Sequence, residues 1–118
     1  MAEFPQSERG RRATRVRMQA QTIRIAAAQP VTGVLQTLSR TGGRAVLTSA
    51  VSEGELVEVE INTACGAIAG LVEMLAPRTG AAGHVQAFRF VGLSDEDGAR
   101  LQEVLRLVKG LGGGGKGR

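Results

Sequence analysis

Short runs of alternating apolar and polar residues follow one another through most of this chain, and they constrain its fold more than any other feature. In residues 57–61, for example, Val57, Val59 and Ile61 alternate with glutamates. Alternation with a period of two is typical of a β-strand with one face in the core and one in water. With glycine and proline turns between the runs, we expect strands at residues 16–25, 31–38, 44–48, 57–61, 63–75 and 84–91.

Three segments carry further expectations. The alternation in residues 16–25 shifts phase by one residue, which is typical of a bulge or a bend in a long strand. In residues 63–75, which are mostly apolar, Gly66 and Gly70 are expected to relieve crowding or to allow a bend. Residues 77–83 begin with a proline and end with a glycine, so we expect a loop there.

A helical pattern begins at Ser94. Residues 94–97 resemble a capping box, with acidic side chains over the helix N-terminus. Apolar residues then recur at positions 101, 104, 105 and 108, which lie on one helical face. We expect a helix over about residues 94–109 and a disordered, glycine-rich tail at residues 110–118. Strands followed by one helix predict an all-β fold, a six-stranded antiparallel β-barrel capped by the C-terminal helix.

The residue types that catalysis and metal binding need are scarce. The 118 residues include one cysteine (Cys65), one histidine (His84) and two aspartates, both at the expected helix start. They supply no disulfide, no thiolate metal cluster and no acid–base set, so we expect neither enzyme activity nor a cofactor. Three phenylalanines without tyrosine or tryptophan argue against a platform that stacks single-stranded nucleic acid on aromatic rings.

The length suits a single domain that does not enter a membrane. No uncharged apolar run reaches about 18 residues, the length that a membrane-spanning helix needs. The N-terminus lacks the apolar core of a signal peptide. We therefore expect a cytoplasmic protein.

The excess positive charge lies in the N-terminal segment. Residues 1–24 hold six arginines and two glutamates, which accounts for the whole formal net charge of +4, because the remaining basic and acidic residues balance. Residues 1–14 show no apolar period and are expected to form a flexible, arginine-rich arm. By itself, such an arm is either a solvated tail or a loose nucleic-acid-binding segment.

Two motifs follow one another along the chain, an arginine motif and then a serine–glycine motif. Arg11 and Arg15 form an R-x-x-x-R pattern before the first expected strand, and residues 37–43 read Thr-Leu-Ser-Arg-Thr-Gly-Gly at the turn between the second and third. Together they resemble the PilZ domain, in which R-x-x-x-R is followed about twenty residues later by (D/N)-x-S-x-x-G. Residues 90–101 resemble the last strand of that family and its entry into the C-terminal helix. The resemblance covers roughly residues 9–108.

The resemblance implies a PilZ-type split barrel at residues 15–109 that binds cyclic di-GMP, a bacterial second messenger with two guanines and two phosphates. Arg11 and Arg15 match the motif arginines, and Arg12 is expected to assist at a phosphate or as a stacking plane. Ser39 matches the motif serine, which offers a hydroxyl, and Gly42 matches the glycine that allows a tight turn. The expected ligand-binding residues are Arg11, Arg12, Arg15, Thr37, Ser39, Gly42 and Gly43.

Thr37 departs from the family pattern, because it stands where the family has Asp or Asn. Its hydroxyl is shorter and a weaker acceptor for guanine N–H groups than a carboxylate or an amide oxygen. This departure favours weaker or lost nucleotide binding, and with it a second hypothesis: a degenerate PilZ module that acts through protein contacts alone.

The function that we expect is therefore receptor binding without catalysis. Cyclic di-GMP orders the arginine arm, and the signal passes to a protein effector of unknown identity in motility, biofilm or exopolysaccharide regulation, as the resemblance implies. We expect a monomer or a weak homodimer and no nucleic-acid partner. The less favoured alternative is a small basic nucleic-acid-binding barrel that uses the arm.

Overall fold

Seven strands and one helix form the part of the chain that the computed structural model describes, residues 15–18, 21–81 and 83–116. The arm expected at residues 1–14 and the last two residues of the tail lie outside this part. The elements are β1 (Val16–Arg17), β2 (Thr22–Ala26), β3 (Val31–Leu38), β4 (Gly42–Leu47), β5 (Leu56–Thr63), β6 (Gly66–Gly80), β7 (Gly83–Gly92) and α2 (Asp95–Lys116).

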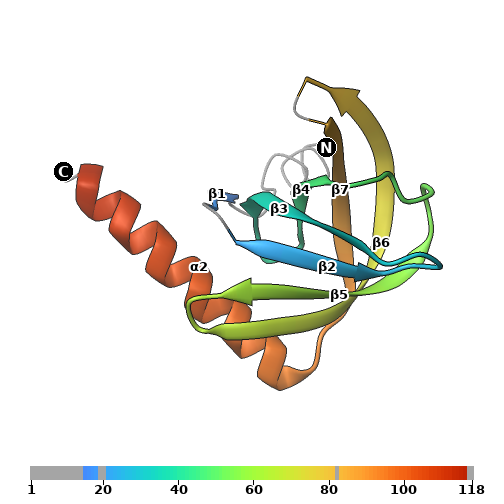
Figure 1. Ribbon diagram of the computed structural model, residues 1–118. Helices are drawn as coiled ribbons and strands as arrows, with labels where there is room; N and C mark the ends of the chain where they lie inside the picture. Colours follow the sequence, from blue (N-terminus) through green and yellow to red (C-terminus); the bar gives the residue numbers. More distant parts are fainter. Residues whose placement is uncertain (1–14, 19–20, 82, 117–118) are drawn as a thin grey trace, which may run out of the picture.

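The strands close into a barrel (Figure 1). Antiparallel pairing runs in the order β3–β2–β5–β6–β7–β4, and a further pairing of β4 with β3 completes the ring, while β1 adds to β3 as an extra strand. Helix α2 follows β7 and packs against β6 and β1. The predicted six-stranded antiparallel barrel with one C-terminal helix is confirmed.

The predicted strand at residues 16–25 is two strands, β1 and β2, which are separated at the predicted phase shift. The Met18 N–H donates to the Gln36 carbonyl, and the Leu35 N–H donates to the Gln21 carbonyl, each at 2.9 Å. Adjacent residues of β3 therefore bond to residues three positions apart on the other side, one at the end of β1 and one before β2. As a result, β1 and β2 share one edge of β3, and Arg15 stands beside the C-terminal end of β3.

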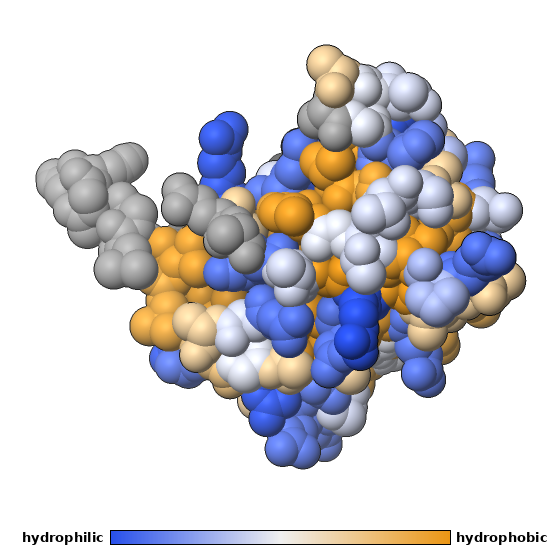
Figure 2. Space-filling model, viewed as in Figure 1, coloured by the Kyte–Doolittle hydropathy of each residue, from blue (hydrophilic) through white to orange (hydrophobic). Residues whose placement is uncertain are grey.

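Alternating apolar side chains from all six barrel strands fill the interior. Ile23, Leu38, Ile61 and Met74 are fully buried, and side chains of α2, such as Leu101, join the same core. Burying one such side chain stabilises the fold by about 1.5–3 kcal/mol. Further along α2, apolar surface faces outward (Figure 2), and Leu107 is 46% exposed.

Two further local expectations are wrong. The predicted strand at residues 63–75 contains a hairpin turn, in which the Thr63 hydroxyl donates to the Gly66 carbonyl and Gly66 has a φ of +110°. The predicted loop at residues 77–83 is strand up to Gly80. Pro77 is tolerated in β6 because β5 pairs no further than Glu73, so that edge of β6 needs no N–H donor beyond this point.

The helix starts as predicted and ends later. Ser94 caps it, since the Asp97 N–H donates to the Ser94 hydroxyl oxygen at 3.0 Å. The helix continues to Lys116 instead of ending near residue 109. Glycine disfavours helical backbone angles without forbidding them, and no proline interrupts this segment.

One buried polar side chain ties a loop to the barrel. Gln86 is 1% exposed; its Oε1 accepts from the Val51 N–H at 2.9 Å, and its Nε2 donates to the carbonyls of Val51 and Leu75. Gln86→Leu keeps the volume and leaves these backbone groups unpaired. We expect a loss of about 2–3 kcal/mol in the free energy of unfolding, measured in urea. The exposed Gln102→Leu is the control, and an equal effect of both variants would contradict this role.

The Asp97 carboxylate links the start of the helix to β6. Its carboxylate accepts from the Ala69 N–H at 3.0 Å and from the Ser94 hydroxyl, and these bonds, with Arg100 nearby, hold its pKa below the ordinary value. A lowered folded-state pKa adds stability that is present above the unfolded pKa of about 3.9 and is lost as the pH falls through the folded value.

We therefore expect Asp97→Asn to destabilise the protein at pH 7, to approach wild type as the pH falls below about 4, and to converge with it below the folded-state pKa of Asp97. Urea unfolding at several pH values measures this. Asp95→Asn, which removes a charge from the same helical turn without touching β6, should show a smaller pH dependence. A constant difference between Asp97→Asn and wild type at every pH would rule out this origin.

Candidate functional site

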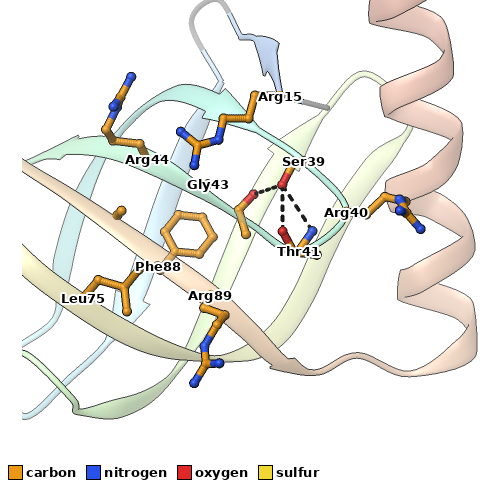
Figure 3. A pocket seen from close by; sticks show the side chains of 11 residues that line it. Arg15, Ser39, Arg40, Thr41, Gly43, Arg44, Leu75, Phe88 and Arg89 are labelled. Atoms are coloured by element: carbon orange, nitrogen blue, oxygen red, sulfur yellow. Dashed lines mark hydrogen bonds between the residues drawn. The ribbon is translucent and has the colours of Figure 1, made fainter. Parts of the chain in front are cut away.

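The turn between β3 and β4 is the centre of the candidate site (Figure 3). The Ser39 N–H donates to the Gly42 carbonyl at 2.8 Å, and the Thr41 N–H donates to the Ser39 hydroxyl oxygen at 3.2 Å. Ser39 is 4% exposed, and its hydroxyl donates a hydrogen bond to the Gly42 carbonyl oxygen at 3.3 Å. The serine of the predicted motif thus fixes the shape of its own turn.

The two glycines after this turn let β4 approach β7 closely. A Cβ on Gly42 would lie 2.1 Å from the Phe88 carbonyl oxygen. One on Gly43 would lie 2.7 Å from the Thr37 backbone carbonyl oxygen and 2.8 Å from the Phe88 ring. Neither position has room for a side chain. The Phe90 N–H donates to the Thr41 carbonyl at 2.8 Å and fastens the turn to β7.

A pocket of about 460 Å³ opens where this turn meets β4, β6 and β7. Its size is in the range of small-molecule sites. Leu75, Ala87 and Phe88 form its apolar part. The residues that give it charge are four arginines from separate segments: Arg15, Arg40, Arg44 and Arg89.

The pocket therefore gathers positive charge with little compensation. Arg44 donates from Nε to the Gln36 amide oxygen at 3.2 Å, and Arg89 pairs with Glu73. Within the described residues, Arg15, Arg40 and Arg44 form no salt bridge. In Figure 3 the Arg15 guanidinium points toward the Gly43 and Phe88 region, whereas Arg40 and Arg89 point outward. Such a concentration of one charge attracts anions.

The structure brings together part of the predicted set. Arg15, Ser39, Gly42 and Gly43 line the same pocket. Arg11 and Arg12 lie outside the described residues.

Thr37 lies in a second, adjoining hollow. This hollow has a volume of about 330 Å³ and shares Arg44 with the first pocket. Thr37 is the direct neighbour of Arg17 across β1 and of Arg44 across β4, so the three side chains share one face of the sheet. The Thr37 hydroxyl oxygen is buried and has no hydrogen-bond partner in the described part of the chain.

Three arginines of the pocket were missed by the sequence analysis. Arg40 occupies a variable position of the motif, and Arg44 and Arg89 sit on strands whose pattern shows only that they face outward. Their meeting depends on the register of β4 against β7, in which Gly42 is opposite Arg89 and Arg44 is opposite Ala87. No local signal in the sequence sets that register.

Two other kinds of site are missing from the described ranges. No group of three or more His, Cys, Asp or Glu side chains is placed there to hold a metal ion. None of the helical residues in those ranges forms a span long and apolar enough to cross a membrane.

Sequence comparison finds nothing similar, neither among protein-family models nor among curated proteins. Comparison of the fold finds similar solved structures. The PilZ domain of YcgR from Escherichia coli, solved with c-di-GMP, matches at a TM-score of 0.70 and 18% identity, covering 84% of this chain and 91% of that one.

Two longer structures match as well. YcgR from Escherichia coli in complex with c-di-GMP matches at a TM-score of 0.74 and 20% identity over 92% of this chain. The inhibitor of motility MotI/DgrA from Bacillus subtilis matches at 0.67 and 16% identity over 81%. This chain covers 50% and 51% of these two, about half of each. The resemblance that the two sequence motifs predict is therefore confirmed in three dimensions: the chain has the fold of a PilZ domain.

Proposed function

We propose that this protein binds cyclic di-GMP in the arginine-lined pocket and passes the signal to a protein partner. One observation carries the proposal: the motif residues Arg15, Ser39 and Gly42 meet in one pocket with three further arginines. The structures of similar fold that were solved with c-di-GMP support it.

The chemistry of the pocket suits this ligand. Guanidinium groups bind phosphate oxygens bidentately, pair with the O6 and N7 edge of guanine and stack on flat rings. A ligand with two phosphates and two guanines offers all three kinds of contact. Arg11 precedes Arg15 by four residues, and an extended chain of that length spans about 14 Å at most. Arg11 is therefore within reach of the pocket that Arg15 lines.

The consequence of binding is expected to appear in a partner. The composition offers no acid–base set for catalysis, so we propose a cytoplasmic receptor without enzyme activity, monomeric or weakly dimeric. Ordering of the N-terminal arm over the ligand would reshape one face of the barrel. We propose motility, biofilm formation or exopolysaccharide synthesis as the regulated process, which is what the family resemblance implies.

Thr37 favours a second candidate function. It replaces the acidic or amide residue of the motif, and its buried hydroxyl oxygen has no partner in the described residues. A module that has lost nucleotide binding and works through protein contacts alone would tolerate this change. Calorimetric titration of the protein with cyclic di-GMP, with GTP and cyclic GMP as controls, separates the two functions.

The motif arginines should contribute to binding individually. We expect Arg15→Ala and Arg11→Ala each to weaken cyclic di-GMP binding by about 1–3 kcal/mol, the range for a good bidentate contact. Unfolding stability should stay within about 0.5 kcal/mol, since the Arg15 side chain is exposed. Arg24→Ala is the matched control, because Arg24 pairs with Glu60 and does not line the pocket. Unchanged affinity in either variant would remove that residue from the site.

Restoring the family residue at position 37 should strengthen binding. Thr37→Asn adds a planar acceptor next to Arg44, and one added hydrogen bond to a guanine edge is worth about 0.5–1.5 kcal/mol. Thr37→Asp has the further effect of pairing with a motif arginine. If both variants bind with wild-type affinity, position 37 does not contact the ligand. If both bind more weakly, the threonine is already the fitted group.

A further inference from the structure

Arg89 takes part both in the lining of the pocket and in an ion pair. The residue is part of the lining of the arginine-rich pocket, whereas its guanidinium points away from the pocket centre (Figure 3) and forms an ion pair with Glu73 on the neighbouring strand β6. It is the only pocket arginine with an acidic partner within the described residues. A ligand that carries phosphate would therefore compete with a carboxylate for this one guanidinium.

The backbone of Arg89 is held in position from both sides. Arg89 stands opposite Gly42 of β4 and opposite Glu73 of β6. A Cβ on Gly42 would lie 3.0 Å from the Arg89 Cα, so the motif glycine allows β7 to come directly against the turn that carries Ser39. With the backbone fixed in this way, a contact between Arg89 and a ligand in the pocket requires its side chain to turn away from Glu73.

The ion pair is of a kind that is easily exchanged. The side chain of Arg89 is 59% exposed and that of Glu73 is 29% exposed. Pairs in such surroundings are weak, because water screens them. A phosphate accepts two parallel hydrogen bonds from a guanidinium, and here it would also be attracted by Arg15, Arg40 and Arg44. The exchange therefore costs little and is favoured once the anion is in the pocket.

We propose that Glu73 holds Arg89 in the free protein and that Arg89 passes to a phosphate of the bound nucleotide, which leaves Glu73 unpaired. The proposal rests on the proposed function, since the nucleotide must enter this pocket. Glu73 acts as a built-in competitor that lowers the affinity, and Arg89 is a binding residue beyond the two motifs.

The exchange carries occupancy of the pocket to the outer face of β6. Glu73 is the cross-strand neighbour of Leu56, which is 59% exposed, and Leu71 lies on the same face and is 39% exposed. Binding thus turns a neutral ion pair into a free carboxylate beside exposed apolar side chains. A partner that contacts this face would meet a different charge in the bound state.

The chain provides a matched control pair. Arg24 and Glu60 are also cross-strand neighbours, with Nη2 and Oε1 3.1 Å apart and side chains 68% and 45% exposed, and neither lines the pocket of Arg89. Glu60→Gln removes the same charge as Glu73→Gln and leaves the competition for Arg89 intact. Comparing the two variants separates local competition from the general effect of net charge.

Calorimetric titration with cyclic di-GMP tests the exchange. We expect Glu73→Gln to bind up to about fivefold more tightly than wild type, as the loss of a weak ion pair allows, and Glu60→Gln to bind like wild type. Arg89→Ala should bind about tenfold more weakly. The double variant Arg89→Ala with Glu73→Gln should bind like Arg89→Ala alone, because the glutamate then has nothing to withhold.

Several results would overturn the exchange. If Glu73→Gln and Glu60→Gln have equal effects, the glutamate acts only through net charge; if Arg89→Ala binds like wild type, Arg89 is not a ligand contact. In both cases wild-type binding still supports the proposed function. Failure of the folded wild type to bind the nucleotide overturns the exchange and the proposed function together. Circular dichroism of each variant establishes that it is folded.

Discussion

The close approach of β4 to β7 at Gly42 and Gly43 is the constraint on which the rest of this structure depends. A Cβ at these positions would lie within 3 Å of the Phe88 carbonyl oxygen and ring on β7 and of the Thr37 carbonyl oxygen on β3. Since β4 joins β3 to β7, this contact closes the barrel. The same contact seats the Ser39 turn against β7 and creates the pocket beside it. One pair of small residues thus serves the fold and the site together.

The fold concentrates positive charge at the pocket, and among the described residues only Arg89 has an acidic partner there. Its arginines come from the segment before β1, from the turn, from β4 and from β7, so only the closed barrel brings them together. Like charges held close repel one another, and an anion of two phosphates relieves that repulsion while it gains hydrogen bonds. A site built in this way is suited to binding an anion. Among the described residues that line it there is no histidine, cysteine or carboxylate.

Local pattern was enough to predict the fold class and the motif turn, and long-range register was needed for the remainder. The strand at residues 31–38 and the helix start at Ser94 follow from periodicity and capping chemistry. The hairpin at Thr63–Gly66 is hidden in a continuous apolar run, so periodicity could not reveal it. The contact of Arg89 with the Ser39 turn depends on which residue of β4 faces which residue of β7. The residues near Arg89 in the sequence do not indicate that register.

The spacing of the R-x-x-x-R motif has an energetic consequence for the proposed site. If the segment before Arg15 is a flexible arm, as the sequence predicts, ordering the four residues from Arg11 to Thr14 costs about 1–2 kcal/mol for each backbone unit. A hydrogen bond to a charged group returns only about 1.5–3 kcal/mol. Four such units cost about 4–8 kcal/mol, and a bidentate contact by Arg11 would return about 3–6 kcal/mol, so a second contact, such as one by Arg12, would be needed to offset the cost. Several arginines in this segment would therefore favour binding at the proposed site.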